Sequence, residues 1–263
     1  MTELASLPQH QSLFHYNMVI GLAGDGFSTT INIFNYFNGM MFGDGYESPA
    51  TADLVFYDQH GKEGFKIQRR LEPWSSAYID LGEELRRDKA VGAAGVVMGT
   101  IYSRLIPDTV PAMLKGKRVS TELTAEIETP SGARDFIHNT GAPAYVPIVS
   151  QYKGGILFAD QFTDPCHMVL VNRYLGPKIP FISEGFAKIE IKNHLGDSRT
   201  ATTERVPARG MRLFSILDHF PDIYDFLDGQ CGVMNVKAAN LMHKPWIWFG
   251  ARDGKSDISI DHT

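Results

Sequence analysis

The sequence has few cysteines and no local motif for metal or thiol chemistry. Its 263 residues include two cysteines, Cys166 and Cys231, and no C-x-x-C pair. Two cysteines cannot build a disulfide framework, and the missing pair removes the usual zinc and thiol-redox signatures. We therefore predict a protein of a reducing compartment that carries no cofactor.

Signals for export or membrane insertion are also missing. Met1–Gln11 contains Glu3 and has neither the basic nor the apolar stretch of a secretory signal. Ala90–Ile101 is the longest apolar-looking run, and it is glycine-rich and roughly a dozen residues long, whereas a bilayer needs about 20. We predict a cytoplasmic protein without a membrane span.

Charge and composition exclude two further classes of protein. The 25 basic and 30 acidic residues give a net charge of −5, and the basic residues are scattered in pairs. Because no cationic stripe is present, we expect no nucleic-acid partner. The 25 glycines and 14 prolines stay well below the roughly 25–30% of a low-complexity chain, so we expect an ordered protein.

What the sequence does contain is a weak internal repeat. Ala50–Leu85 aligns with Gly185–Phe220 at a constant offset of 135 in residue number. Each segment has an alternating strand, a polar turn with glycine, a second strand that ends at a proline, and a third strand that leads into a short acidic stretch. Any two β-rich segments look alike to some degree because strands and turns use few residue types, but this ordered series of matching features favours a duplication.

The repeat extends in both directions at an offset of 137 in residue number. Upstream, Thr30–Asn35 matches His167–Asn172, and both segments end in asparagine. Downstream, we align Gly95–Met98 with Gly232–Asn235. A short insertion or deletion reconciles the two offsets.

Hydrophobic periodicity predicts an all-β protein. Short apolar runs of period two are separated by turn residues about every ten positions, which is typical of sandwiches. We expect two tandem related β-sandwich domains of jelly-roll-like type, residues 1–134 and 135–263, with an extra loop or strand segment at 105–132 in the first. Helical patterns occur at Gly82–Lys89 and Pro221–Leu227.

The proline corner Glu204–Arg209 (ERVPAR), followed by Gly210–Leu213, together with the Asn-terminated and alternating strands, resembles the sensory rhodopsin transducer family. The corner of the first copy, Leu71–Ser75 (LEPWS), matches less well. The resemblance covers about residues 15–104 and 150–240. It implies a β-sandwich that forms oligomers and binds sugar-like small molecules or signalling partners without catalysis. That family usually has one copy of the module, so the tandem arrangement is a departure.

Aromatic residues near the C-terminus form the predicted ligand site. Alternation in Lys244–Arg252 (KPWIWFGAR) places Trp246, Trp248 and Arg252 on one strand face. Exposed indoles beside a guanidinium suit a flat ligand, whereas buried indoles would belong to the sandwich or to a subunit interface. The other predicted ligand-binding residues are His138, Asn139 and Tyr152.

Catalytic motifs are scarce. The nine histidines form neither H-x-H nor H-E-x-x-H, and no G-x-S-x-G turn occurs. Cys166 and His167 would point to opposite faces of a regular strand. We predict no metal; a site assembled from distant strands would use His138, His167, Asp261 and His262.

Together these features predict a non-catalytic, homo-oligomeric binding protein of the cytoplasm, for a small molecule of carbohydrate-like chemistry or a signalling partner. Two alternatives stay open. One is an enzyme with an inter-domain site built on histidines and carboxylates, with or without a metal. The other is a structural subunit of an assembly with its aromatic side chains buried.

Overall fold

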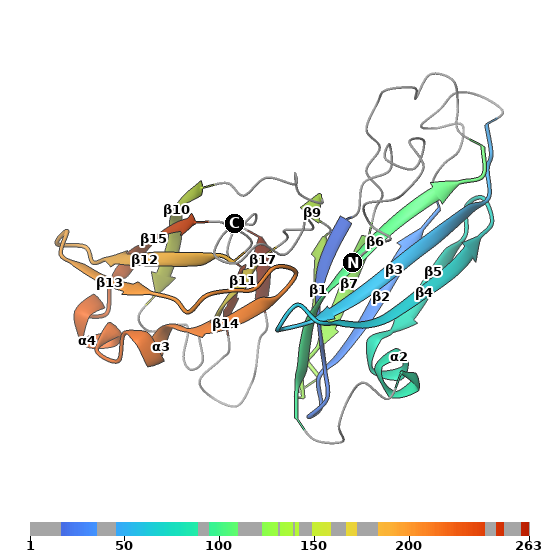
Figure 1. The fold of residues 1–263 in the computed structure, drawn as a ribbon. Coiled ribbons are helices and arrows are strands. Elements are labelled where there is room, and N and C mark those ends of the chain that lie inside the picture. The colour runs from blue at the N-terminus through green and yellow to red at the C-terminus, as the bar shows by residue number, and fades with distance from the viewer. Residues whose placement is uncertain are drawn as a thin grey trace. The chain divides into compact units, whose positions relative to one another are not determined.

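The computed structural model describes residues 17–35, 46–88, 95–109, 123–130, 132–138, 140–141, 149–158, 167–172, 184–239, 246–249 and 259–262. These residues are mostly strands, arranged in four sheets with a few short helices (Figure 1). The predicted all-β class is therefore confirmed. None of the helices in the described ranges is long and apolar enough to cross a membrane.

The chain divides into two compact units. The first comprises Met1–Asp58, Lys62–Ile127 and Phe136–Ala142, and the second comprises Gln59–Gly61, Glu128–Asp135 and Pro143–Thr263. Each unit contains two sheets, so each is a β-sandwich.

The first unit has sheets of order β4-β3-β6-β1-β9 and β5-β2-β7-β8. Its elements are β1 (Asn17–Ala23), β2 (Ser28–Phe34), β3 (Ala50–Asp58), β4 (Glu63–Leu71), β5 (Ser76–Asp80), α2 (Leu81–Arg87), β6 (Val97–Pro107), β7 (Leu123–Glu128), β8 (Arg134–His138) and β9 (Thr140–Gly141). The predicted boundary at residue 134 would give β8 and β9 to the second copy, but both strands pair within the sheets of the first unit.

The second unit has sheets of order β10-β15-β12-β13 and β14-β11-β16-β17. Its elements are β10 (Val149–Phe158), β11 (His167–Val171), β12 (Phe186–Lys192), β13 (Ser198–Thr202), β14 (Met211–Ser215), α3 (Ile216–His219), α4 (Ile223–Leu227), β15 (Cys231–Ala239), β16 (Trp246–Phe249) and β17 (Ser259–His262).

The two units share one topology. Counting eight strands from the start of each unit, both have sheets of order 4-3-6-1 and 5-2-7-8. Strands 3–4 and 7–8 are hairpins within one sheet, and the other connections between these described strands lead to the opposite sheet. This alternation between two four-stranded sheets is jelly-roll-like and confirms the predicted pair of related sandwiches. β7 has its counterpart in β16, so the strand within segment 105–132 belongs to the shared module.

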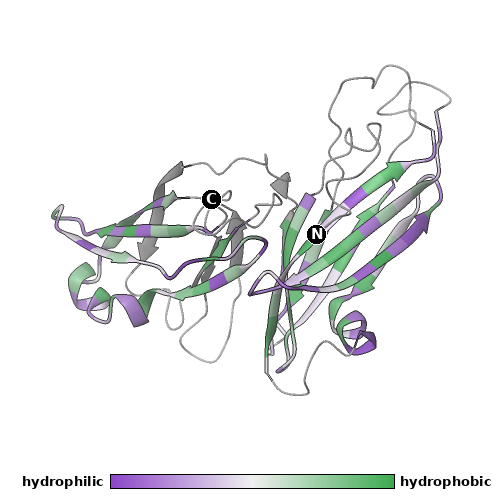
Figure 2. Ribbon diagram, in the orientation of Figure 1, coloured by the Kyte–Doolittle hydropathy of each residue, from purple (hydrophilic) through white to green (hydrophobic). Residues whose placement is uncertain are grey.

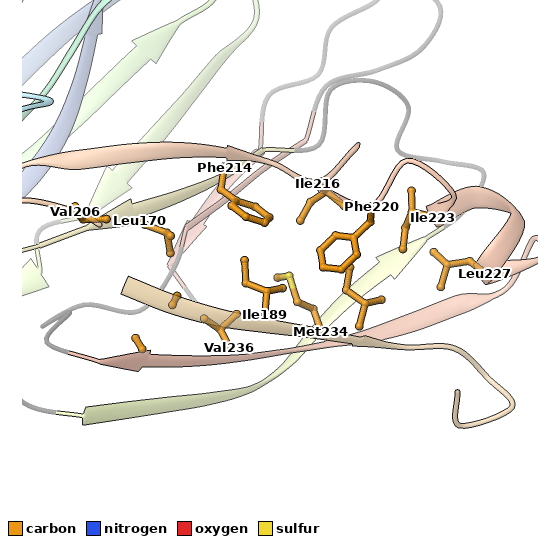
Figure 3. Packing of buried hydrophobic residues seen from close by; sticks show 13 residues of the cluster. Leu170, Ile189, Val206, Phe214, Ile216, Phe220, Ile223, Leu227, Met234 and Val236 are labelled. Atoms are coloured by element: carbon orange, nitrogen blue, oxygen red, sulfur yellow. The ribbon is translucent and has the colours of Figure 1, made fainter. Parts of the chain in front are cut away.

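Alternating side chains build the core of the second unit. In β12, Ala187, Ile189 and Ile191 are buried while Lys188 and Lys192 are exposed, as period-two polarity requires. Figure 2 shows hydrophobic and hydrophilic residues mixed in this way along the strands of both units. Figure 3 shows the hydrophobic core of the second unit, to which both its strands and its short helices contribute buried side chains. The labelled residues are Leu170, Ile189, Val206, Phe214, Ile216, Phe220, Ile223, Leu227, Met234 and Val236.

Equivalent hydrogen bonds support the predicted offsets of 135 and 137. The Asn35 backbone N–H donates to the Ser75 carbonyl at 2.9 Å, and the Asn172 N–H donates to the Gly210 carbonyl at 3.0 Å. Trp74 and Arg209, which the offset of 135 aligns, have left-handed φ values of 64° and 65°. Both side chains therefore sit on a backbone turn that the fold itself imposes.

Strand register corrects the predicted downstream alignment. Tyr57 lies opposite Thr100, and its equivalent Lys192 lies opposite Val233, so the offset there is 133 rather than 137. Gly99, not Gly95, is therefore the counterpart of Gly232. The runs of small residues around both glycines match at either offset, so only hydrogen-bonded pairing distinguishes the two alignments.

The helices differ partly from the sequence prediction. α2 and α4 lie where the helical patterns were found, but α3 was missed because its four residues are too few for a periodic signal. By the offset of 135, α3 is the counterpart of α2. The two helices have the same kind of N-cap. The Asp80 side chain accepts from the Glu83 N–H, and the Ser215 side chain accepts from the Asp218 N–H.

Candidate functional site

The first unit exposes a group of aromatic side chains on one sheet. In β2, Thr29, Ile31 and Ile33 point into the core, so Asn32 and Phe34 lie on the outer face of sheet β5-β2-β7-β8. Phe34 of β2, Tyr78 of β5 and Phe136 of β8 are 37%, 71% and 61% exposed. We call this surface, with Asn32 and Glu126 of β7, the aromatic face.

Strand pairing brings members of the aromatic face together. Asn32 lies directly opposite Tyr78, and Phe34 lies opposite Ser76. Phe34 and Tyr78 are therefore diagonal neighbours, a relation with a Cα separation of about 7–8 Å that aromatic side chains can bridge. The two rings and the Asn32 amide occupy adjacent positions on β2 and β5.

The β7–β8 hairpin sets the far side of the same face. Next to the turn, the Thr129 N–H donates to the Ala133 carbonyl at 2.9 Å. One residue further from the turn on each strand, Arg134 and Glu128 form an ion pair of 2.8 Å. Counting two residues further along each strand places Glu126 opposite Phe136. A carboxylate therefore lies next to the exposed ring.

Trp74 lies at the corner where the chain enters β5. Its backbone N–H donates to the carbonyl of Asn35, the residue after Phe34, at 3.1 Å. Its indole is 49% exposed and Nε1 donates to Glu47 Oε1 at 3.2 Å. The backbone turn recurs at Arg209, so the turn belongs to the fold, whereas the aligned position of the second unit holds a guanidinium in place of the indole.

The second unit serves as an internal comparison for this face. Its equivalent of the Asn32–Tyr78 pair is Val169–Leu213, which has the same register between β11 and β14. Val169 is 1% exposed, and so is Val171, the equivalent of Phe34. Because the same topology forms with aliphatic residues at these positions, the fold does not require the aromatic face.

The resolved pKa shifts lie away from this face. The hydrogen bond from the Arg70 guanidinium lowers the pKa of the Asp108 carboxyl, and the same bond raises the pKa of Arg70. Within the described ranges, no three His, Cys, Asp or Glu side chains lie close enough to hold a metal ion. What the aromatic face offers chemically is ring stacking and hydrogen-bond acceptors.

The residues predicted from sequence fall into three places. Trp246 and Trp248 lie in β16, where Trp248 pairs with His167 and Trp246 pairs with His262. Asp261 pairs with Ile247 in the same sheet. The structure thus brings both tryptophans and three of the four predicted metal ligands together in sheet β14-β11-β16-β17, although it describes only their backbone.

The other predicted residues lie elsewhere. Tyr152 lies in the opposite sheet of the second unit, paired with the core residue Val236. His138 ends β8 of the first unit. Asn139 and Arg252 lie outside the described residues. The ligand-binding and metal assignments made from sequence stay predictions.

Sequence reasoning missed Phe34, Trp74, Tyr78 and Phe136. The signal that could have found three of them is the repeat itself, because the aligned positions in the second copy hold Val171, Arg209 and Leu213. A position that is aromatic in one copy and not in the other is a candidate for function. Phe136 lies beyond the aligned segments, and only its exposure identifies it.

Comparisons with known proteins add little. No family description matches the chain, and no curated protein sequence matches it. Two structures of a glycosyl hydrolase family 2 member from Bacteroides cellulosilyticus, one of them from microfluidic crystals, are 7% and 8% identical. The matches cover 94% of this chain and 28% and 26% of those chains, at a TM-score of 0.18 each. The chain spans less than a third of either structure, and a likeness this low supports no conclusion.

Proposed function

We propose that this protein is a non-catalytic binding protein and that the aromatic face holds a small molecule of carbohydrate-like chemistry. The observation that carries the proposal is the exposure of Phe34, Tyr78 and Phe136 on one sheet face, where the second unit has the buried Val171 in place of Phe34 and the half-buried Leu213 in place of Tyr78. Exposed rings grouped on one face are costly to leave in water, which is typical of a recognition surface.

The chemistry of the face matches a sugar ring. The apolar C–H face of a pyranose stacks on an aromatic ring, and its hydroxyls need acceptors at the edge of the platform. Tyr78 and Phe34 supply adjoining rings, and the Glu126 carboxylate lies next to Phe136. A cytoplasmic location, a homo-oligomeric state and an origin of the two units by duplication belong to the same proposal.

Titration calorimetry with a defined saccharide panel tests the proposal. Cellotetraose, maltotetraose, xylotetraose and mannotetraose are titrated into the wild type and into Tyr78→Ala. Leu195→Ala is the matched control, because Leu195 is a 74% exposed apolar residue in a turn of the second unit. We expect at least one saccharide to bind the wild type.

Tyr78→Ala should then bind that saccharide about tenfold more weakly, because one aromatic contact is worth about 0.5–1.5 kcal/mol beyond its buried area. Leu195→Ala should bind as the wild type does. Both changes are on the surface, so the free energy of unfolding should stay within about 0.5 kcal/mol of the wild type. Failure of all four saccharides to bind at 10 mM, or equal binding by Tyr78→Ala, contradicts the proposal.

A further inference from the structure

Two lysines and a threonine lie side by side on the outer face of sheet β10-β15-β12-β13 in the second unit. Lys188 of β12 lies directly opposite Lys237 of β15 on one side and directly opposite Thr202 of β13 on the other. All three residues are exposed, because their strand neighbours Ile189 and Val236 point into the core. We call these three residues the lysine row.

The two ammonium groups of the lysine row repel each other. Side chains directly opposite in an antiparallel pair have Cβ atoms about 4.5–5.5 Å apart, and like charges in such a pair are destabilising. Glu190, the acidic residue that the described strands place on this face, forms an ion pair of 3.9 Å with Lys192 and accepts from Asn235 Nδ2 at 3.4 Å. The lysine row is therefore a cationic spot on a chain whose net charge is −5.

The first unit holds a carboxylate in the same row. By the offsets of 135 in β3 and 133 in β6, the equivalents of the two lysines are Asp53 and Arg104, and Gln68 of β4 takes the place of the threonine. Arg104 Nη2 donates to Asp53 Oδ2 at 2.7 Å, and Gln68 Nε2 donates to Asp53 Oδ1 at 2.7 Å. This sheet position therefore accommodates a carboxylate between donors from the two neighbouring strands.

The second unit keeps a donor on each side of the row and lacks the carboxylate. Lys237 is cationic like Arg104, and the Thr202 hydroxyl is a donor like the Gln68 amide. At the central position, however, a third donor, Lys188, replaces the acceptor. A carboxylate supplied by a ligand would provide the missing acceptor and offset the repulsion between the two ammonium groups.

We infer that the lysine row is a binding site for a small dicarboxylate, whose two negative charges match the two ammonium groups and whose oxygens accept from them and from the Thr202 hydroxyl. The site lies in the second unit and is independent of the aromatic face and of the saccharide proposed for it. Because the row is exposed, water and salt compete with each contact, so binding should weaken as salt is added.

The test titrates sodium malonate into the full chain, isotope-labelled at lysine, and follows the backbone amide signals of Lys188 and Lys237 by NMR at constant ionic strength. Malonamide is the uncharged control ligand. Lys188→Asp supplies within the chain the carboxylate that the first unit has. Lys192→Asp is the matched control, because it makes the same change of charge four residues along the same strand face.

We expect malonate to shift both lysine signals with half-saturation on the order of 10 mM, and malonamide to shift neither. In Lys188→Asp the new carboxylate takes the place of the ligand, so the half-saturation concentration read from the Lys237 signal should rise at least tenfold. Lys192→Asp should change it less than threefold, because salt screens charges at that separation.

Urea unfolding provides a second readout that needs no ligand. Lys188→Asp and Lys188→Asn have side chains of the same shape, and only the aspartate can form an ion pair with Lys237. Lys188→Asp should therefore have the higher urea midpoint at pH 7, and the difference should disappear in acid, where the carboxylate is protonated.

Each contrary result overturns the inference. Shifts that do not saturate up to about 100 mM malonate, or equal shifts with malonamide, would show that no site is present. An equal loss of binding in Lys192→Asp would show that malonate responds only to the overall charge of the face. A midpoint of Lys188→Asp at or below that of Lys188→Asn would show that the row does not accept a carboxylate. The saccharide titrations decide the proposed function separately.

Discussion

Replacing Asn35 by alanine should destabilise the first unit, and the magnitude follows from its contacts. The side chain is fully buried, and Nδ2 lies 3.0 Å from the Ser48 carbonyl, 3.3 Å from that of Leu71 and 3.1 Å from that of Glu72. An amide nitrogen has two hydrogens, so it makes two full hydrogen bonds shared among three acceptors.

Alanine removes both bonds, and the Ser48 and Leu71 carbonyls lose this donor, whereas the Glu72 carbonyl still accepts from the Ser75 N–H and hydroxyl. Each lost bond costs about 1 kcal/mol net, and an orphaned buried acceptor raises the cost toward about 1–3 kcal/mol. We expect a loss of about 2–4 kcal/mol in the free energy of unfolding of the first unit. Asn172→Ala should produce a loss of the same sign in the second unit, because Asn172 Nδ2 bonds the Val206 carbonyl at 3.1 Å.

Urea unfolding followed by circular dichroism measures the global effect, and amide hydrogen exchange localises it. The Trp74 N–H bonds the Asn35 carbonyl, so its exchange should accelerate in Asn35→Ala. Thr30→Ala, on the outer face of the preceding strand β2, is the control and should stay within about 0.5 kcal/mol. A change of less than about 0.5 kcal/mol in Asn35→Ala would show that water or a shifted backbone satisfies these carbonyls, and would refute the reasoning.

The remaining predictions concern packing and pH. Gly99→Ala should lower the free energy of unfolding by about 1–3 kcal/mol, because the new Cβ would lie 2.3 Å from both the Phe56 ring and the Tyr57 carbonyl. A melting temperature equal to that of the wild type would contradict this. Gly82→Ala, within α2, would place its Cβ 3.2 Å from Asp80 Oδ1, 3.4 Å from Arg86 Nη1 and 3.9 Å from Ala23 Cβ. Because the two nearer atoms end exposed side chains that can shift, the change should raise the free energy of unfolding by about 0.5–1 kcal/mol. The lowered pKa of Asp108 means that its ion pair with Arg70 stabilises the fold above the unfolded pKa and loses that effect as the pH falls through the folded pKa. We would measure the free energy of unfolding of wild type and Asp108→Asn in urea between pH 7 and pH 2.5. The two values should differ slightly at neutral pH and become equal in acid. A difference that persists in acid would contradict the ion-pair explanation.

Local patterns were enough to predict much of the fold. Period-two runs identified the strands, and the Asn-ended strand, the polar turn and the proline corner aligned the copies, because each depends on residues close in sequence. Gly61 and Gly196 of the two matched turns illustrate this, because a turn that needs a left-handed residue selects glycine wherever it occurs.

Such local patterns could not predict the aromatic face, which carries the proposed function. Whether Tyr78 is exposed or buried depends on which side of β5 faces the core, and the short residue pattern of that strand fits either orientation. The alignment of Gly232 with Gly99 likewise needed the hydrogen-bonded register between β15 and β12.

The sequence alone determined the all-β class and the repeat with its two matched asparagines, because backbone geometry and side-chain period are local properties. Tertiary structure decided which sheet face stays exposed and which residues lie opposite each other. Those properties depend on strands far apart in the chain: β2 and β5 are separated by more than forty residues between Phe34 and Tyr78, and only their pairing places Asn32 beside the exposed ring.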